Sequence, residues 1–410
     1  MKKKIKMIVV CTSFEHCGGV ERFLLNFLNI FPEERYQIDL LLFDDKQDDA
    51  KMFDMVPENI RILSFLKQFS RWSTELIQEL RDTHGNYVAD VRNFIHLRNT
   101  DPNFTKLAIS ERHEKNWEIL STICPYYDGY DVAVAFRNTL PLKVVAENVT
   151  AEKKYVFIHT DIKTASDAEN GQVVSLLTAE NPYLKKMNGI ICVTKQNAEK
   201  FSNVFPTLSD KVNILVNVCD HETMIHKSKE FYPPEYAKDT YNILTVARIE
   251  KGKGIELLID AARILKDSDI NFRWIVLGKN HVNQFYERYL ELLKMSNIED
   301  CVIHVAEQPN IFPYYLNCDL YVHTSFFEGR SLAIEEAMVL NCPIVTTNFP
   351  SVYDQIKDGM NGRICEMSAK SMAETILILL KDETERYRIS RANVDYLGNE
   401  GKINYFEYFS

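Results

Sequence analysis

Short apolar segments rich in valine and isoleucine alternate with amphipathic segments along most of the chain. Such short runs are typical of strands buried on both faces, and the stretches between them have helical spacing. This alternation predicts an α/β protein with parallel sheets covered by helices. In the first half, the expected strands are residues 5–11, 38–43, 60–64, 132–136, 155–159, 190–193 and 212–216, and the expected helices are residues 20–30, 115–123 and 172–187.

A polar stretch with two prolines, residues 230–240, interrupts the alternation. We therefore predict one α/β domain at residues 1–230, a second at residues 231–385, and a C-terminal segment, residues 386–410, that returns to the first domain. Residues 67–111 have weak periodicity and receive no assignment. The second series consists of strands at 241–247, 273–277, 302–305, 320–323, 344–346 and 363–365, and helices at 254–266, 283–295, 331–340 and 369–380.

The composition narrows the possible function classes. With 410 residues, 46% of them hydrophobic, the chain can form large cores, and its length fits two domains. The formal net charge of −10 argues against a nucleic-acid-binding protein, which needs a basic surface to neutralise phosphates. The basic run at residues 2–6 is expected to be a solvated lead-in to the first strand, and contact with anionic lipid head groups is the alternative.

Cysteine usage and the lengths of the apolar runs predict a cytoplasmic protein. Nine cysteines are scattered along the chain without a C-x-x-C pair, which fits a reducing compartment and no zinc site. No apolar run reaches the roughly 20 residues of a membrane span, and the N-terminus lacks the pattern of a signal peptide. We expect a soluble cytoplasmic protein, with peripheral binding at the inner face of the membrane as the alternative.

Residues 328–340 contain a carboxylate within a nearly apolar helix. Because apolar residues cover almost the whole circumference of this helix, it is expected to be buried, and Glu336 with it. A buried carboxylate needs hydrogen-bond donors. Hydroxyl groups of a bound ligand are one source of donors, and a buried salt bridge to an arginine is the other.

The start of the same helix is a candidate anion site. Glu328 and Gly329 precede its first turn, where free backbone N–H groups and the helix dipole favour an anion. Ser331 has the alternative role of an N-cap, and Arg330 that of a surface residue.

The loop at residues 246–254 is a candidate diphosphate site. Arg248 and Lys253 are five positions apart in a loop with two glycines, in front of an expected helix. A guanidinium offers a bidentate fork and an ammonium a point charge, which together suit a diphosphate. Exposed charges on a solvated loop are the alternative.

Two more segments follow expected strands, at the end where open α/β sheets bind ligands. Gly18 and Gly19 would let the backbone approach a ligand, but a tight strand-to-helix turn explains them equally well. His159 lies where a strand runs into a loop, and a structural histidine is the alternative. Asp267 and Asp269 form a D-x-D pair at the opposite end of a strand and are expected to form a turn. No metal site is predicted.

In this order, the segments resemble the retaining glycosyltransferases of family 4. The second-domain segments look like that family's diphosphate loop and its Glu-seven-Glu signature. The resemblance implies the GT-B fold, in which two Rossmann-like α/β domains face each other across a cleft. It covers most of the chain, through residues 18–22, 131–136, 157–161, 191–194 and 213–217 in the first domain and 246–254, 328–338, 343–347 and 358–362 in the second.

The resemblance also implies roles for single residues. Arg248 and Lys253 would hold the donor's diphosphate and stabilise its growing charge without a metal. Glu336 would bind the donor's ribose, Glu328 the transferred sugar, and His159 would lie near the reacting sugar. The implied donor-binding residues are Gly18, Gly19, Arg248, Lys253, Glu328, Gly329, Arg330, Ser331, Leu332 and Glu336, and the implied catalytic residues are Arg248, Lys253, Glu328 and His159.

The implied reaction is transfer of a hexose or N-acetylhexosamine from a nucleotide diphosphate sugar, with UDP favoured, to a saccharide or lipid-linked saccharide, as in surface polysaccharide synthesis. No cofactor, metal or nucleic acid is expected to take part. Two other functions of this fold remain open: a nucleotide-sugar 2-epimerase and a catalytically idle subunit that only binds. Ala306 stands where the family often has glycine, in the loop near the nucleotide base, which leaves the choice of nucleotide open. Phe349-Pro350 replaces a glycine pair that is usual in the family.

Overall fold

The computed structural model of the chain describes residues 3–12, 18–43, 53–64, 117, 124–159, 171–279, 284–397 and 402–410. The chain forms two compact units. The N-terminal unit contains Met1–His16, Leu28–Leu215 and Ile403–Ser410, and the C-terminal unit contains Cys17–Phe27 and Val216–Lys402. The first part of helix α1 (Gly19–Ile30) therefore belongs to the C-terminal unit.

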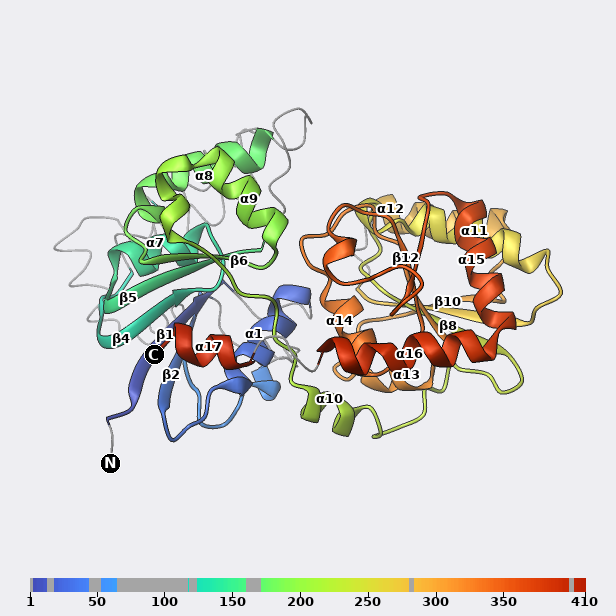
Figure 1. Cartoon of the computed structure of the whole chain (residues 1–410), viewed down its shortest axis with the longest axis horizontal. Helices are drawn as coiled ribbons and strands as arrows, with labels where there is room; N and C mark the ends of the chain where they lie inside the picture. Colours follow the sequence, from blue (N-terminus) through green and yellow to red (C-terminus); the bar gives the residue numbers. More distant parts are fainter. Residues whose placement is uncertain are drawn as a thin grey trace, which may run out of the picture. The chain divides into compact units, whose positions relative to one another are not determined.

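A seven-stranded parallel sheet forms the core of the N-terminal unit (Figure 1). A strand is present at each of the seven expected positions, but β4 and β5 begin earlier than predicted, at Tyr127 and Val149. The added residues are mostly polar, and most are at least partly exposed, so they lack the apolar run that marks a buried strand. The strands, in the order β3-β2-β1-β4-β5-β6-β7, are β1 (Ile5–Cys11), β2 (Tyr36–Leu42), β3 (Arg61–Ser64), β4 (Tyr127–Ala135), β5 (Val149–Ile158), β6 (Gly189–Cys192) and β7 (Val212–Ile214).

Helices α7 (Leu140–Glu147) and α8 (Gly171–Leu184) cover one face of this sheet, where Val156 and Ile158 pack with Leu142. The sequence pattern did not predict α7 or α9 (Lys195–Val204). Of the predicted helix at residues 115–123 only residue 117 is described, and residues 67–111 lie outside the described residues. The unit also contains the short 3-10 helices η1 (Phe53–Met55) and η2 (Pro206–Lys211).

The C-terminal helix α17 (Lys402–Tyr408) packs against the N-terminal unit. The ring of Tyr155 on β5 lies 5.0 Å from the ring of Tyr408 and 5.1 Å from that of Phe409, measured between centroids. A Cβ atom at Gly189 would collide with the Tyr408 hydroxyl, so glycine at the start of β6 makes room for the helix. The chain end at residues 403–410 therefore returns to the N-terminal unit.

The C-terminal unit contains a six-stranded parallel sheet in the order β10-β9-β8-β11-β12-β13. Its strands lie within two residues of the predicted ends. They are β8 (Tyr241–Val246), β9 (Phe272–Leu277), β10 (Val302–Val305), β11 (Leu320–His323), β12 (Ile344–Thr347) and β13 (Arg363–Cys365).

Helices cover both faces of the second sheet (Figure 1). Helices α11 (Ile255–Lys266), α12 (Gln284–Met295) and α15 (Ala369–Lys381) pack in one core with Trp274 of β9. Helices α10 (His221–Lys227), α13 (Phe312–Asn317), α14 (Leu332–Val339) and α16 (Glu383–Leu397) contact one another on the other side. The segment predicted to return to the first domain therefore begins with a helix, α16, that remains in the C-terminal unit.

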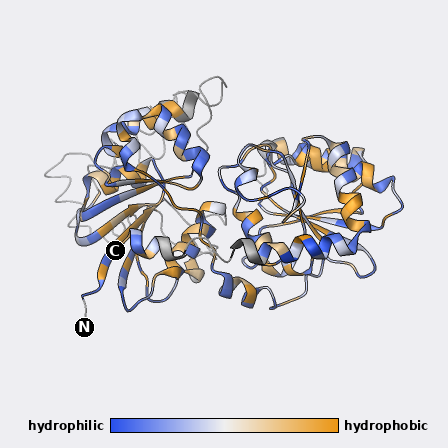
Figure 2. Cartoon of the chain, viewed as in Figure 1, coloured by the Kyte–Doolittle hydropathy of each residue, from blue (hydrophilic) through white to orange (hydrophobic). Residues whose placement is uncertain are grey.

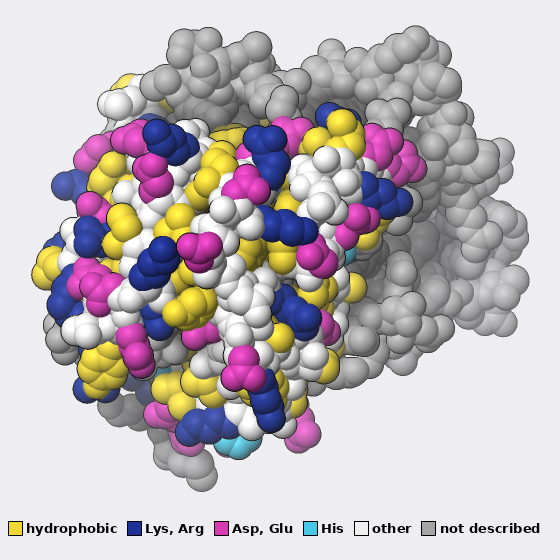
Figure 3. Space-filling model, turned by 90° about the vertical axis from the view of Figure 1, so that its right-hand side faces the viewer, with side chains coloured by type: hydrophobic (Ala, Val, Ile, Leu, Met, Phe, Trp, Pro, Cys, Tyr) yellow, Lys and Arg dark blue, Asp and Glu magenta, His cyan; other side chains and the backbone are white. Residues whose placement is uncertain are grey.

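The strands of both sheets are predominantly hydrophobic, as Figure 2 shows. The face of the chain in Figure 3 carries positive and negative side chains intermixed, without a large area of one sign. Among the helices of the described ranges, none is both long enough and apolar enough to cross a membrane. The eight cysteines that the structure describes are free thiols.

Candidate functional site

The strand order of the C-terminal sheet places two loops side by side. Strands β8 and β11 are neighbours, with Ile243 paired to Leu320, although two strands separate them in the sequence. At such a switch point the helices that follow the two strands lie on opposite faces, and the loops leave a crevice that open α/β sheets use for ligands. The loops here are the predicted diphosphate loop after β8 and the Glu328 loop after β11.

Hydrogen bonds to backbone carbonyl oxygens hold the two loops together. The Thr324 hydroxyl donates to the carbonyl oxygen of Lys253 at 2.6 Å, and the Phe326 N–H donates to the carbonyl oxygen of Gly252 at 3.1 Å. Gly254, the N-cap of α11, has a φ angle of 65°, and a Cβ there would fall on the carbonyl oxygen of Thr324. Glycine at this position is therefore needed both for the left-handed backbone and for the close approach of the loops.

Lys253 and Glu328 meet at this junction. The Lys253 ammonium lies 2.7 Å from Oε1 of Glu328, and the Ser325 hydroxyl donates to the same oxygen at 2.7 Å. His323, at the end of β11, places Nε2 at 3.3 Å from that oxygen. The lysine side chain is 21% exposed and the glutamate 16%, so the ammonium reaches the surface while paired. Two of the predicted catalytic residues thus form one group.

The Glu328 carboxylate is held in its ionised form. Burial raises the pKa of this carboxyl, but the charge of Lys253 and the hydrogen bonds from His323 and Lys253 outweigh burial and keep the pKa well below its usual value. An ionised carboxylate accepts hydrogen bonds only, so it suits ligand hydroxyls.

Arg248 lies in the same loop but has a different partner. Its Nη2 is 3.0 Å from Oε1 of Glu250, and its side chain is 52% exposed. A salt bridge this exposed contributes little to stability. The guanidinium can therefore exchange Glu250 for a phosphate at small cost.

The first turn of α14 is capped from within the chain. The Ser331 hydroxyl is the N-cap and accepts from the Ile334 N–H at 3.4 Å. The backbone N–H of Ser331 donates to Oε1 of Gln355 at 2.9 Å. The backbone N–H of Ser331, an implied donor-binding residue, is therefore already paired within the protein. Gly329 and Leu332 flank this turn and show no left-handed backbone.

Arg330 is not a surface residue. Its side chain is buried and forms an ion pair with Glu335 on the first turn of α14. The alternative considered from the sequence, an exposed arginine, is therefore wrong. The apolar pattern of the helix gave no sign that Glu335 is buried as well as Glu336.

Glu336 is buried, with 1% of its side chain exposed, as the apolar pattern of α14 predicted. Its Oε1 lies 2.9 Å from Nε of Arg22, and its Oε2 accepts from the Tyr315 hydroxyl at 3.1 Å. Two kinds of partner were expected for this carboxylate, ligand hydroxyls and an arginine, and the structure shows the arginine. Burial raises the pKa of Glu336, while the charge of Arg22 and the Tyr315 hydrogen bond act in the opposite direction.

Gly18 precedes α1 and Gly19 is its first residue, in the segment that belongs to the C-terminal unit. Neither has a positive φ angle. A Cβ at Gly18 would meet only the far end of the flexible Glu21 side chain, and a Cβ at Gly19 would meet nothing within 4 Å. Folding therefore does not require glycine at position 19, and the approach of a ligand to this residue stays a prediction.

His159 follows β5 in the N-terminal unit. Its Nε2 lies 2.8 Å from the carbonyl oxygen of Phe136, so Nε2 carries the proton in the neutral ring. The ring stacks on Phe157 with 5.6 Å between centroids. Burial lowers the pKa of His159 to about 4, against the effect of the hydrogen bond to Phe136. The imidazole is therefore uncharged at neutral pH.

Residues 227–395 match the family of glycosyl transferases group 1. The match covers less than half of the chain. We refer to residues 227–395 as the group 1 domain. The chain is 29% identical over 203 residues to the N-acetylgalactosamine-N,N'-diacetylbacillosaminyl-diphospho-undecaprenol 4-alpha-N-acetylgalactosaminyltransferase of Campylobacter jejuni, covering 49% of this chain and 53% of that protein. It is 30% identical over 246 residues to the capsular polysaccharide biosynthesis glycosyltransferase CapM of Staphylococcus aureus, covering 58% and 57%. The chain spans about half the length of these relatives.

Solved structures resemble the chain over nearly its whole length. HepE of Anabaena in complex with UDP-glucose has a TM-score of 0.67 at 15% identity and covers 99% of this chain and 98% of its own. A mutant of S. aureus TarM in complex with Fondaparinux, alpha-GlcNAc-glycerol and UDP has a TM-score of 0.68 at 14% identity, with 98% of each chain covered. The predicted GT-B fold is confirmed. The match of residues 227–395 agrees with the predicted family over that part of the chain, and the assignment to family 4 stays a prediction.

Sequence reasoning missed the side chains that contact the two predicted site glutamates, Glu328 and Glu336. His323 and Ser325 contact Glu328 in the group 1 domain, and Arg22 and Tyr315 contact Glu336. Arg22 lies in a segment already compared with the family, but no local pattern connects it to a glutamate in the other half of the chain. Among the described residues, no three His, Cys, Asp or Glu side chains are arranged as they would be around a metal ion.

The neutral state of His159 predicts a loss of stability in acid. The pKa of His159 is about 4 in the folded chain and about 6.5 in the unfolded chain. At pH values between about 4 and 6.5, the unfolded chain therefore binds more protons at this residue than the folded chain does. The contribution of this residue is complete above about pH 6.5 and is lost as the pH falls toward about 4. The loss should reach about 2 kcal/mol, less than the full shift implies, because the residue is only partly buried.

Chemical denaturation of the wild type and of His159→Gln, followed from neutral to acidic pH, measures this effect. The difference in unfolding free energy between the two proteins should shrink as the pH falls, because glutamine does not titrate. A difference that stays constant across this range would contradict the assignment of a neutral His159.

Proposed function

We propose that the chain is a retaining glycosyltransferase that moves a hexose or N-acetylhexosamine from a nucleotide diphosphate sugar to a saccharide or lipid-linked saccharide. The observation that carries the proposal is the Lys253–Glu328 pair at the switch point of the group 1 domain. An ammonium and an ionised carboxylate side by side suit a ligand that joins a diphosphate to a polyhydroxylated sugar.

UDP is the proposed nucleotide, supported by the neighbours of known structure whose complexes contain UDP or UDP-glucose. The proposed acceptor class is supported by relatives described as acting on a diphospho-undecaprenol saccharide and in capsular polysaccharide synthesis. We further propose that the protein works in the cytoplasm, at the inner face of the membrane when the acceptor is lipid-linked.

In the proposed reaction, the bond between the anomeric carbon and the diphosphate oxygen breaks, and the acceptor hydroxyl bonds to the same face of that carbon. The hydroxyl proton passes to the departing diphosphate. Lys253 and Arg248 stabilise the negative charge on the leaving group, so their positive charges supply what a metal would otherwise supply.

Glu328 binds hydroxyls of the transferred sugar in this proposal and does not attack it. Lys253 and Ser325 already donate to its Oε1, and His323 Nε2 lies 3.3 Å from the same oxygen, so this oxygen is a poor nucleophile. Glu336 accepts hydrogen bonds from the donor's ribose. His159 is uncharged and acts near the reacting sugar as a hydrogen-bonding group.

Incubation of the purified chain with UDP-hexoses and UDP-N-acetylhexosamines, with and without an undecaprenyl-linked saccharide, tests the proposal. The expected result is a new glycoside that forms only with acceptor and keeps the donor's α configuration, measured by mass spectrometry and NMR. An isomerised donor without acceptor would indicate a 2-epimerase. Binding without turnover of any donor would indicate an idle subunit.

A further inference from the structure

Arg22 contacts the predicted ribose-binding carboxylate from the opposite end of the sequence. It lies on the first turn of α1, and both it and Glu336 belong to the C-terminal unit. Its Nε and the Tyr315 hydroxyl each contact one oxygen of Glu336. A carboxylate has about four lone-pair positions, so each oxygen keeps one for a further donor.

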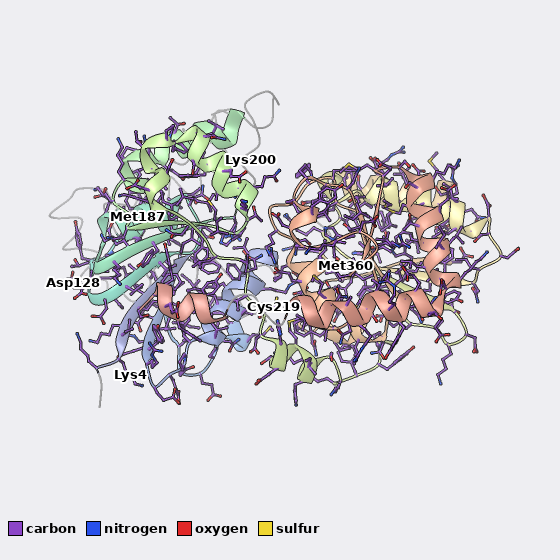
Figure 4. The ribbon with its side chains drawn as sticks, in the orientation of Figure 1. Lys4, Asp128, Met187, Lys200, Cys219 and Met360 are labelled. Carbon is purple, nitrogen blue, oxygen red and sulfur yellow. The ribbon has the colours of Figure 1, made fainter. Side chains whose placement is uncertain are left out.

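Charged groups surround Glu336 on several elements. Arg330 and Glu335 form a second buried ion pair beside it. Cys219, labelled in Figure 4, lies just before α10, and its pKa is raised by burial first and then by Glu335 and Glu336, with Arg330 and Arg22 acting in the opposite direction. The two arginines and two glutamates therefore share one buried cluster, in which each charge is balanced.

The other titratable groups that face Glu336 cannot replace Arg22. Tyr315 on α13 and Tyr321 on β11 are buried, and burial and the negative charge of Glu336 raise the pKa values of both. Both side chains are therefore neutral. Arg330 is occupied by Glu335. Without Arg22, the buried carboxylate would lose its own cation, and such a group tends to take up a proton.

We propose that Arg22 is a positioning residue for donor binding, which holds Glu336 ionised and oriented so that both of its oxygens accept hydroxyls of the nucleotide's ribose. This inference rests on the proposed function. The Arg22 side chain is 18% exposed, so the pair reaches the surface at the arginine. A protonated Glu336 would keep fewer acceptor positions and would bind the ribose less well.

Calorimetric binding of UDP to Arg22→Met, at about pH 8 and about pH 6, tests the proposal against the wild type. Without Arg22, the ribose should lose a hydrogen bond to the ionised Glu336. The loss of such a hydrogen bond to a charged group should weaken UDP binding about 10- to 100-fold. The loss relative to the wild type should be larger at the lower pH, where the unpaired Glu336 takes up a proton. Arg22→Lys should recover most of the affinity and remove the difference between the two pH values.

The matched control is Arg61→Met, since Arg61 also pairs with a buried carboxylate, Asp39, with 2.9 Å between Nε and Oδ1. It should bind UDP as the wild type does. In steady-state kinetics, Arg22→Met should raise KM for the nucleotide sugar more than it lowers kcat, because the residue acts on binding.

A double-mutant cycle decides whether Arg22 acts through Glu336. In the background of Glu336→Gln, the second change Arg22→Met should add little further loss of affinity. An undiminished effect in that background, or UDP binding by Arg22→Met as tight as in the wild type at both pH values, would overturn the proposal. Arg22→Lys keeps the test decisive if the methionine variant does not fold. Absence of UDP binding by the wild type would instead remove the proposed nucleotide and this inference together.

Discussion

Replacing Lys253 with methionine is expected to lower kcat/KM for sugar transfer by about 100- to 1000-fold. Loss of one preorganised donor to a developing anion has an effect of this size. Methionine keeps most of the length of the side chain, so the change removes the charge and little volume. The measurement is steady-state transfer from the nucleotide sugar identified in the donor screen.

The loss should be larger in kcat than in KM. The negative charge on the diphosphate grows as the glycosidic bond breaks, so an ammonium beside it stabilises the transition state more than the bound donor. Glu328 keeps Ser325 and His323 as neighbours in this variant, and the thermal unfolding temperature should change little.

Lys266→Met is the matched control for this prediction. Lys266 also forms an ion pair at 2.7 Å, with Asp300. It is the last residue of α11, whereas Lys253 lies just before the first residue of the same helix, so the two lysines are at opposite ends of α11. This variant should transfer sugar at the wild-type rate. Equal activities of the Lys253 and Lys266 variants would show that Lys253 does not stabilise the leaving group.

The parts of the fold and site that the sequence predicted depend on local patterns. Buried strands of valine and isoleucine are recognisable from composition alone, and the repeated strand and helix order implies which strand ends meet. Lys253 and Glu328 follow the first and fourth strands of the second sheet, so their proximity follows from the doubly wound order. Burial of Glu336 follows from the apolar residues around its helix.

The parts that the sequence did not predict depend on contacts between distant residues. Nothing near Arg22 in the sequence indicates that it pairs with Glu336, because the two residues are far apart along the chain and meet only in the folded structure. The Arg330–Glu335 pair was not predicted for a related reason. Charged residues are expected to be exposed unless an oppositely charged partner is known to be buried with them. The buried cluster is thus a product of tertiary structure.

The helices missed in the N-terminal unit have weaker local signals. Helix α7 has only eight residues and a proline in its first turn, and α9 has a low proportion of apolar residues. Residues that favour the start of a helix are nevertheless present in both segments. Proline is favoured in the first turn of a helix, and Thr194 is an N-cap whose hydroxyl accepts from the Asn197 N–H at 3.1 Å.

Replacing Gly254 with alanine is expected to destabilise the C-terminal unit by about 2–5 kcal/mol. A left-handed conformation costs an alanine about 1–2 kcal/mol. The new Cβ would also fall on the carbonyl oxygen of Thr324, and forced overpacking costs about 1–3 kcal/mol more. Chemical denaturation of the wild type and the variant measures the loss.

Gly359→Ala separates the two contributions. Gly359 also has a left-handed backbone, with a φ angle of 72°, but a Cβ there would meet its nearest atom, Nη1 of Arg363, at 3.7 Å, which is an ordinary contact. This control should therefore show only the conformational cost of about 1–2 kcal/mol.

The same change at Gly254 should also affect the chemistry, because this glycine lies where the two loops of the site meet. To relieve the collision, the carbonyl of Thr324 must move away from α11, and the hydroxyl of Thr324 is bonded to the carbonyl of Lys253. A shift of either loop changes the distance between Lys253 and Glu328, and a misplacement of about 1 Å can cost about 100-fold in rate. Gly254→Ala should therefore lose transfer activity at temperatures where it is still folded, while Gly359→Ala keeps it. If the Gly254 variant were as active as the Gly359 variant, the close contact of the two loops would matter for folding only, and not for the geometry of the site.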